Sequence, residues 1–144
     1  MDITVKTRLT TDAKLPAYAH PGDAGMDLFS NEEATLAPME RALVPTGVFL
    51  EIPEGFEGQV RPKSGLAIKQ GLTCLNTPGT IDAGYRGEVK VILINLGKEE
   101  VILLKGSKIA QLVFSKVDYA QLDVTDNLSD SKRGEGGFGS TGER

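Results

Sequence analysis

The feature that most restricts the fold is a series of short apolar stretches interrupted by Gly and Pro at strand-length intervals. β-Branched residues dominate these stretches, and residues 3–9 and 56–61 alternate apolar with polar side chains, as half-buried strands do. Residues 87–95 begin in alternation and end as a continuous apolar run, which is typical of a strand buried on both faces. The other expected strands are residues 42–44, 47–52, 101–104 and 109–114. The pattern predicts an all-β sandwich or barrel.

One short helix is expected among these strands, over residues 64–70. Ser64 is placed to cap its N-terminus, and Gly71 is placed to end it. The free N–H groups at such a helix start suit an anion.

Length and charge exclude several classes of protein. A chain of 144 residues suits one domain with its own core. The 16 basic and 20 acidic side chains give a net charge of -4, which argues against a protein that holds nucleic acid by neutralising phosphates. No apolar stretch is long enough to cross a membrane, and no signal peptide is recognisable, so we expect no membrane partner. The single cysteine, Cys74, excludes an intrachain disulfide and is typical of a cytoplasmic protein.

The scarcity of histidine and cysteine restricts the chemistry further. His20 and Cys74 together are too few ligands for a usual zinc site. His20 stands in a turn-like stretch and no nucleophile-elbow motif accompanies it, so a Ser-His-Asp hydrolase is not indicated. We interpret His20 as a surface turn residue and Cys74 as a small buried apolar residue. The chemistry must therefore rest on carboxylates, amides, Lys and Arg, hydroxyls, backbone groups or a hard metal ion.

Five segments combine glycine with polar residues that a core would not accommodate. They are AGMDL (24–28), RPKSGLA (61–67), LNTPGTIDAGYRG (75–87), GSKIAQL (106–112) and RGEGGFGSTG (133–142). Residues 61–67 can bind phosphate or form a solvated strand-to-helix turn. The last segment lacks the lysine of a P-loop, but its N–H groups can form a nest for phosphate. Composition alone favours a flexible terminus for residues 126–144.

The third and fifth segments carry the clearest chemical signals. The Asn76 amide presents a donor and an acceptor, the pattern needed against a pyrimidine edge. Asp82 lies between two apolar residues, where it can act as a general base toward water or cap the turn before Gly84. Phe138 is an aromatic residue among glycines, and stacking on a base would explain it. The order of base-reading residue, phosphate segment and carboxylate suggests a nucleotide hydrolase.

Taken together and in order, the five segments resemble the five motifs of the trimeric dUTPase family, over about residues 3–142. The resemblance implies a jelly-roll subunit that assembles as a homotrimer. Each active site would take the first, second and fourth motifs from one chain, the third from another and the fifth from the last. Residues 1–125 would form the core, and residues 126–144 a flexible arm that closes over a neighbour's site. The implied reaction is Mg²⁺-dependent hydrolysis of dUTP to dUMP and pyrophosphate, which limits uracil incorporation into DNA and supplies dUMP for thymidylate synthesis.

The resemblance also implies a role for each motif residue. Asp82 would activate the water that attacks the α-phosphorus, and Gln111 would help to hold that water. Asp27 would support the Mg²⁺ hydration shell through water, or the neighbouring structure. The base and sugar would be bound by Asn76, Ile81, Tyr85 and Phe138. The phosphates would be bound by Arg61, Lys63, Ser64, Gly65, Gln111, Arg133, Gly139, Ser140 and Thr141. Lys63 departs from the family, in which arginine is frequent, so its phosphate contact is less directional.

Two alternatives are weighed against this interpretation. dCTP deaminases share the fold, but the resemblance places their catalytic glutamate at Ile92, which cannot act as an acid or a base. A catalytically silent nucleotide-binding trimer would not need to retain Asp82, Tyr85 and the arm. All three are present, which favours the hydrolase.

Overall fold

The chain forms ten strands and one short helix in residues 2–144, the part that this computed structural model describes. In chain order they are β1 (Lys6–Leu9), β2 (Met26–Phe29), β3 (Ala34–Leu36), β4 (Arg41–Glu51), β5 (Phe56–Arg61), α1 (Ser64–Gln70), β6 (Leu72–Cys74), β7 (Gly79–Ile81), β8 (Glu88–Asn95), β9 (Val101–Leu103) and β10 (Lys108–Lys116). The prediction of an all-β fold with one short helix is confirmed.

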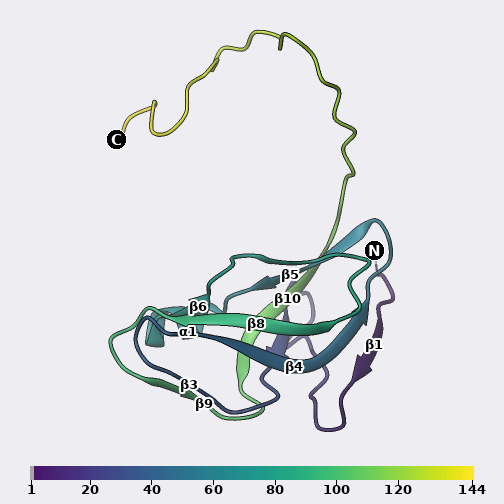
Figure 1. Cartoon of the computed structure of the whole chain (residues 1–144), viewed down its shortest axis with the longest axis vertical. Helices are drawn as coiled ribbons and strands as arrows, with labels where there is room; N and C mark the ends of the chain where they lie inside the picture. Colours follow the sequence, from purple (N-terminus) through teal and green to yellow (C-terminus); the bar gives the residue numbers. More distant parts are fainter. Residues whose placement is uncertain (1) are drawn as a thin grey trace.

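The strands form two four-stranded sheets and a two-stranded ribbon, all paired antiparallel. The first sheet has the order β1-β4-β8-β6, the second β2-β10-β5-β7, and β3 pairs with β9. Figure 1 shows β4 and β8 side by side across the body. Apolar residues of both sheets join in one core, including Val48 and Val91 from the first sheet and Val60 and Leu112 from the second. This is the jelly-roll-like sandwich that the sequence predicts.

The strand boundary expected at Pro45 is wrong. β4 runs unbroken from Arg41 to Glu51, and its pairing with β8 shifts register between Pro45 and Val48. Proline cannot donate to a ladder, and a β-bulge tolerates that loss without ending the strand. The short strands β2, β3, β6 and β7 were not expected, because three or four residues are too few to show a period; the equally short β9 was expected from the continuous apolar run over 101–104.

Part of the outer face of the first sheet is apolar. β8 alternates along its whole length, so the expected run buried on both faces is wrong within a single chain. Val91 and Leu93 are buried, whereas Ile92 and Ile94 are only half-buried. Ile92 is paired in register with Leu43, which is 58% exposed. Branched apolar residues therefore line a face that this chain does not cover.

Helix α1 begins and ends where the sequence predicts, with Gly71 closing it in a left-handed conformation. The predicted cap is wrong, because Lys63 occupies the capping position and no side chain caps the helix. Ser64 is instead the first helical residue, and it is exposed.

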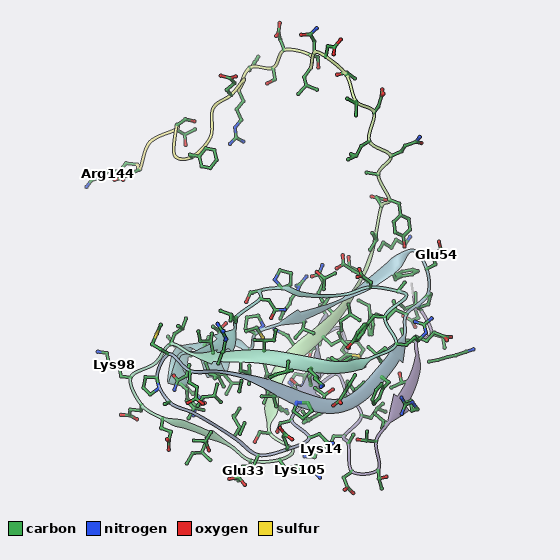
Figure 2. All side chains as sticks on the ribbon, viewed as in Figure 1. Lys14, Glu33, Glu54, Lys98, Lys105 and Arg144 are labelled. Atoms are coloured by element: carbon green, nitrogen blue, oxygen red, sulfur yellow. The ribbon has the colours of Figure 1, made fainter. Side chains whose placement is uncertain are left out.

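After β10 the chain leaves the body as a long arm, drawn in yellow-green and yellow in Figure 1. Tyr119 is the last arm residue in the hydrogen-bond network of the body, where its hydroxyl accepts the N–H of Gly55 at 3.0 Å. Beyond it the arm arcs through open space to Arg144 (Figure 2), and Leu122, Val124 and Leu128 are each at least 87% exposed. No helix within residues 2–144 is long and apolar enough to cross a membrane.

Candidate functional site

The residues singled out by the sequence fall into three groups on this chain. The first group, which we call the hairpin pocket, lies between β8 and the turn that joins β6 to β7, two strands that belong to different sheets. The second, the lysine cluster, lies where β2, β5 and β10 meet the start of α1. The third is the glycine-rich end of the arm, residues 133–142.

The hairpin pocket encloses about 340 Å³. Four of the predicted residues line it: Asn76, Ile81, Asp82 and Tyr85. Its walls also include Leu43, Val60, Gly79, Thr80, Glu88, Val89, Lys90 and Ile92. Apolar side chains combined with convergent polar groups are the usual construction of a small-molecule site, and the lining here contains both.

Asn76 and Asp82 present free polar groups to this pocket. Asn76 is exposed in the turn that joins β6 to β7, and among the described residues no hydrogen bond involves its amide. The Asp82 carboxylate is exposed, and within residues 2–144 no ion pair or side-chain hydrogen bond engages it. Both groups are therefore available to a ligand or to water.

A tight turn connects Asp82 to Tyr85. The Tyr85 N–H donates to the Asp82 carbonyl at 3.1 Å, and the Tyr85 hydroxyl donates to the Glu88 carbonyl at 2.8 Å. The Arg86 guanidinium donates to the Ala83 carbonyl at 2.7 Å, across the same turn. The carboxylate and the aromatic ring are thus held by one hydrogen-bonded unit.

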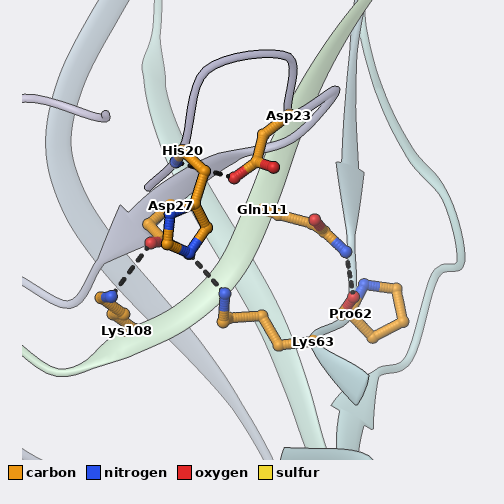
Figure 3. A network of polar contacts seen from close by, with 7 residues as sticks. All are labelled: His20, Asp23, Asp27, Pro62, Lys63, Lys108 and Gln111. Atoms are coloured by element: carbon orange, nitrogen blue, oxygen red, sulfur yellow. Dashed lines mark hydrogen bonds and ion pairs between the residues drawn. The ribbon is translucent and has the colours of Figure 1, made fainter. Parts of the chain in front are cut away.

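The lysine cluster is built around Asp27, which is paired in register with Gln111 across β2 and β10. Figure 3 shows Lys63 and Lys108 reaching the Asp27 carboxylate from two sides. Lys63 forms a short ion pair with Oδ1, and the Lys108 Nζ lies 3.2 Å from Oδ2. Burial raises the pKa of Asp27, but hydrogen bonds to Lys63 and Lys108 and their charges outweigh it and hold that pKa below its usual 3.8.

Gln111 connects the cluster to the segment before α1. Its Nε2 donates to the Pro62 carbonyl at 3.0 Å, next to Lys63 (Figure 3). Arg61 is paired in register with Gln111, and its guanidinium donates to Gln59 Oε1 at 2.6 and 3.0 Å. Ser64 and Gly65 are exposed at the start of α1. The structure thus brings Arg61, Lys63, Ser64, Gly65, Gln111 and Asp27 into one neighbourhood.

The arm end folds into local turns of its own. The Ser140 N–H donates to the Gly137 carbonyl at 3.1 Å, and the two residues between them, Phe138 and Gly139, have φ values of 53° and 85°. Positive φ at both central positions is the signature of a type I′ turn. Phe138 therefore stands at the tip of a turn, fully exposed. Arg133 closes a second turn, where its Nε donates to the Gly136 carbonyl at 2.7 Å.

A single chain does not bring the three groups together. Asp82 lines the hairpin pocket, whereas Gln111 belongs to the lysine cluster, and no residue of that cluster lines the pocket. The arm residues Arg133, Phe138, Gly139, Ser140 and Thr141 lie on the extended arm, away from the body (Figure 1).

Lys108, Glu88 and Lys90 were given no role from the sequence. Lys108 lies in the fourth segment, directly after Gly106 and Ser107. Its positive charge at that position could have indicated a place in the phosphate-binding group. Side chains alternate between the two faces along 88–92, so Glu88 and Lys90 lie on the same face as Ile92. That alternation could have indicated that all three line the pocket.

The donor set fits a Mg²⁺ ion only if the ligand's phosphates provide most of its coordination. No group of three or more His, Cys, Asp or Glu residues in the described part of the chain is arranged to hold a metal ion. Asp27 is neutralised by two ammonium groups, and Asp82 is the unpaired carboxylate of the pocket. Mg²⁺ retains several waters and is commonly bound through one or two carboxylates plus substrate phosphates, which this arrangement permits.

Comparison with known proteins gives a consistent result. The dUTPase family model matches residues 11–142. The deoxyuridine 5'-triphosphate nucleotidohydrolase of Clostridium kluyveri is 55% identical over 142 residues, 99% of each chain. That of Rhizobium etli is 58% identical over 132 residues, 89% of this chain and 85% of the relative.

Two solved structures resemble the fold closely. The dUTPase of Staphylococcus bacteriophage 80alpha with dUPNHPP superposes with a TM-score of 0.91 at 31% identity, covering 97% of this chain and 99% of that one. The D95N dUTPase of S. aureus phage phi11, described with a structural Mg(II) ion, has a TM-score of 0.81 at 28% identity, covering 87% and 98%.

Proposed function

Because this chain belongs to the dUTPase family, we propose that it hydrolyses dUTP to dUMP and pyrophosphate by attack of water on the α-phosphate. The observation that carries the proposal is the hairpin pocket, in which the free Asn76 amide and the free Asp82 carboxylate open on one cavity beside the Tyr85 ring. The reaction limits uracil incorporation into DNA and supplies dUMP for thymidylate synthesis.

The hairpin pocket reads the base and the sugar. The Asn76 amide and the backbone leading to Ile81 bind the uracil edge and leave no room for a methyl group on carbon 5. The Tyr85 ring packs against the deoxyribose and excludes a 2′-hydroxyl. Asp82, in the same turn as Tyr85, orients the water and accepts its proton.

The lysine cluster holds the phosphates. Arg61, Lys63, Ser64 and Gly65 offer charges, a hydroxyl and N–H groups where β5 ends and α1 begins, and Gln111 holds the water and the α-phosphate. Asp27 acts through the two lysines, because its carboxylate is already engaged with both. It maintains the positions of Lys63 and Lys108 and reaches the metal only through water.

The working enzyme is a homotrimer in which three chains share each site. Three observations support this assembly: Asp82 and Gln111 lie in separate groups, the arm end lies away from both, and the first sheet leaves Leu43 exposed and Ile92 and Ile94 only half-buried. A trimer brings one chain's hairpin pocket to another's lysine cluster. The third chain's arm then adds Arg133, Gly139, Ser140 and Thr141 to the phosphates and Phe138 over the base.

Mg²⁺ is the proposed cofactor; the substrate's phosphates would hold it, and Asp27 would support its hydration shell through water. When bound, it neutralises charge on the phosphate oxygens and on the departing pyrophosphate. The protein's own part is to position the chain of phosphates and the attacking water, which is the larger demand in this reaction.

We place the enzyme in the cytoplasm. Its single cysteine is buried, and burial raises the pKa of the Cys74 thiol to about 11. The thiol is therefore protonated and unreactive at neutral pH, which suits a structural residue in a reducing compartment.

The deciding experiment is product analysis with Mg²⁺ and, in parallel, dUTP, dTTP, dCTP and UTP. Release of dUMP and pyrophosphate from dUTP alone is expected. Conversion of dCTP would instead indicate a deaminase, an alternative that the named relatives and the apolar Ile92 in the pocket wall do not favour. Absence of any turnover would leave a nucleotide-binding protein.

A further inference from the structure

We propose that Gly87 sets the discrimination between dUTP and UTP, because it leaves the space in which the Tyr85 ring folds back against the chain. This inference rests on the proposed function, in which the Tyr85 ring packs against the sugar. It gives a positioning role in specificity to a residue that has no side chain and does not line the hairpin pocket.

The Tyr85 ring lies directly on the Gly87 backbone. A Cβ atom placed on Gly87 would be 2.4 Å from the Tyr85 hydroxyl oxygen, 2.6 Å from Cζ and 2.9 Å from Cε1. Carbon atoms in contact are separated by about 3.5–4.0 Å, so even one methyl group cannot share this space with the ring. The Gly87 backbone is not in the left-handed region, and alanine fits its φ without strain. The clash with the ring is therefore the specific reason for glycine here.

Further contacts hold the ring in this position. The Tyr85 hydroxyl donates to the Glu88 carbonyl at 2.8 Å. The Glu88 carboxylate in turn accepts the Gly47 N–H at 2.9 Å, in the bulged part of β4. At the other end, the Tyr85 N–H donates to the Asp82 carbonyl at 3.1 Å. The ring is thus fixed between the turn that carries Asp82 and the start of β8.

Displacing the ring has opposite consequences for the two sugars. The ring packs against the deoxyribose, so dUTP loses a contact when the ring moves. The same movement opens space for a 2′-hydroxyl, so UTP loses an obstacle. The ratio of kcat/KM for dUTP to kcat/KM for UTP must therefore fall, whereas general damage to the fold would lower both values and leave the ratio unchanged.

The same turn offers a matched control. A Cβ placed on Gly84 meets no atom within 4 Å, and Gly84 also lacks a left-handed φ. Gly84→Ala therefore makes the same chemical change three residues away without touching the ring.

The test compares full-length Gly87→Ala and Gly84→Ala with the unmodified protein, using dUTP and UTP with Mg²⁺. We expect the dUTP-to-UTP ratio to fall by about tenfold or more in Gly87→Ala and to stay within about twofold in Gly84→Ala. Binding of imido analogues of both nucleotides gives the same ratio if UTP turnover is too slow to measure. Tyr85→Phe, which keeps Gly87 and removes only the bond to Glu88, should lower the ratio by about threefold and covers the case in which Gly87→Ala does not fold.

A double-mutant cycle identifies the cause. With the ring removed by Tyr85→Ala, adding Gly87→Ala should change the ratio no further. An unchanged ratio in Gly87→Ala, or the same fall in the presence and absence of the ring, would overturn the inference. Failure of the unmodified protein to hydrolyse dUTP, or to prefer it over UTP, would instead overturn the proposed function.

Discussion

Asp27 and Asp82 stand in similar local sequences, yet the fold gives them opposite surroundings. Each follows a glycine by two or three residues and lies between apolar neighbours. Asp27 is 6% exposed and its carboxylate is paired with two lysines. Asp82 is exposed on a turn, without an ion pair in the part of the chain that the structure describes. Local sequence therefore identifies both as unusual carboxylates and does not distinguish their roles.

The difference lies in what each carboxylate can still do. One that is neutralised by two ammonium groups is stabilised as the anion and is a poor proton acceptor, so the Asp27 region is suited to positioning. A carboxylate with both oxygens free can hold and deprotonate a water, so the Asp82 region is suited to chemistry. The predictions below separate these two roles, from the largest expected effect to the smallest.

Asp82→Asn should abolish turnover with little effect on folding. Removing a general base lowers a rate by about 10²–10⁴-fold, and we expect kcat for dUTP to fall by at least about 10²-fold. Within residues 2–144 the Asp82 side chain has no partner to lose, so the unfolding temperature and the affinity for a dUTP imido analogue should be nearly unchanged. Turnover at a comparable rate would show that Asp82 is not the base.

Deleting residues 133–144 should also lower activity while leaving thermal stability unchanged. The arm end contributes nothing to the core of its own chain, so thermal unfolding and the size of the assembly should be unchanged. Turnover should fall by about 10²-fold, since substrate positioning is lost. A matched deletion of residues 143–144 alone should retain activity. A truncated protein with near-normal turnover would exclude the arm from the site.

Asp27→Asn should instead affect stability. The two lysines lose a shared anion, and since their side chains are 28% and 54% exposed, water compensates in part. We expect a loss of about 1–3 kcal/mol in the free energy of unfolding, measured with denaturant. The exposed pair of Asp12 and Lys105, separated by 3.7 Å, provides the control, and Asp12→Asn should cost less than about 0.5 kcal/mol. Equal effects would contradict the assigned role of Asp27.

The contribution of Asp27 should depend on pH with a defined sign. Because its folded pKa lies below the usual 3.8, the stability it contributes is fully present above that value and is lost as the pH falls through the folded pKa. The difference in unfolding free energy between the unmodified protein and Asp27→Asn should be constant above about pH 5 and shrink below about pH 4. A difference that grew on acidification would contradict the lowered pKa.

Lys63→Arg should have the smallest effect. Arginine offers a planar fork to both a carboxylate and a phosphate, so we expect KM for dUTP to fall by about two- to threefold at unchanged kcat. Lys69→Arg serves as the control: it makes the same change in the last turn of α1, at a lysine that forms no ion pair with Asp27. A rise in KM would indicate that Lys63 must fit Asp27 more closely than it must fit phosphate.

Much of the fold was predictable because its signals are local. Alternation along 56–61 and the position of Gly71 depend on neighbouring residues alone, and β5 and the end of α1 lie where they were expected. Strands of three or four residues, such as β6 and β7, have too few residues for a period and are held by their partners in the sheets. Pro45 was misread because the bulge that accommodates it depends on the register with β8.

The candidate site divides in the same way. Asn76, Asp82 and Tyr85 lie within ten positions of one another in the third segment, and the structure places all three in the lining of one pocket. The pairing of Asp27 with Lys63 joins positions 36 residues apart, and no local pattern indicates it. Ile92 and Ile94 were expected to be buried, and only the sheet showed that this chain leaves them half-buried on its outer face.

The sequence by itself determined the all-β class, the short helix, the five polar segments and the resemblance to the dUTPase family, because periodicity, turn residues and motifs are read along the chain. The tertiary structure alone decided which aspartate is neutralised, that Gly87 makes room for the Tyr85 ring, and that three groups of site residues stay apart in one chain. Ion pairs and close contacts depend on sheet register and on the paths of distant segments. Such interactions form between residues that are far apart in the sequence, so the sequence of either segment alone does not reveal them.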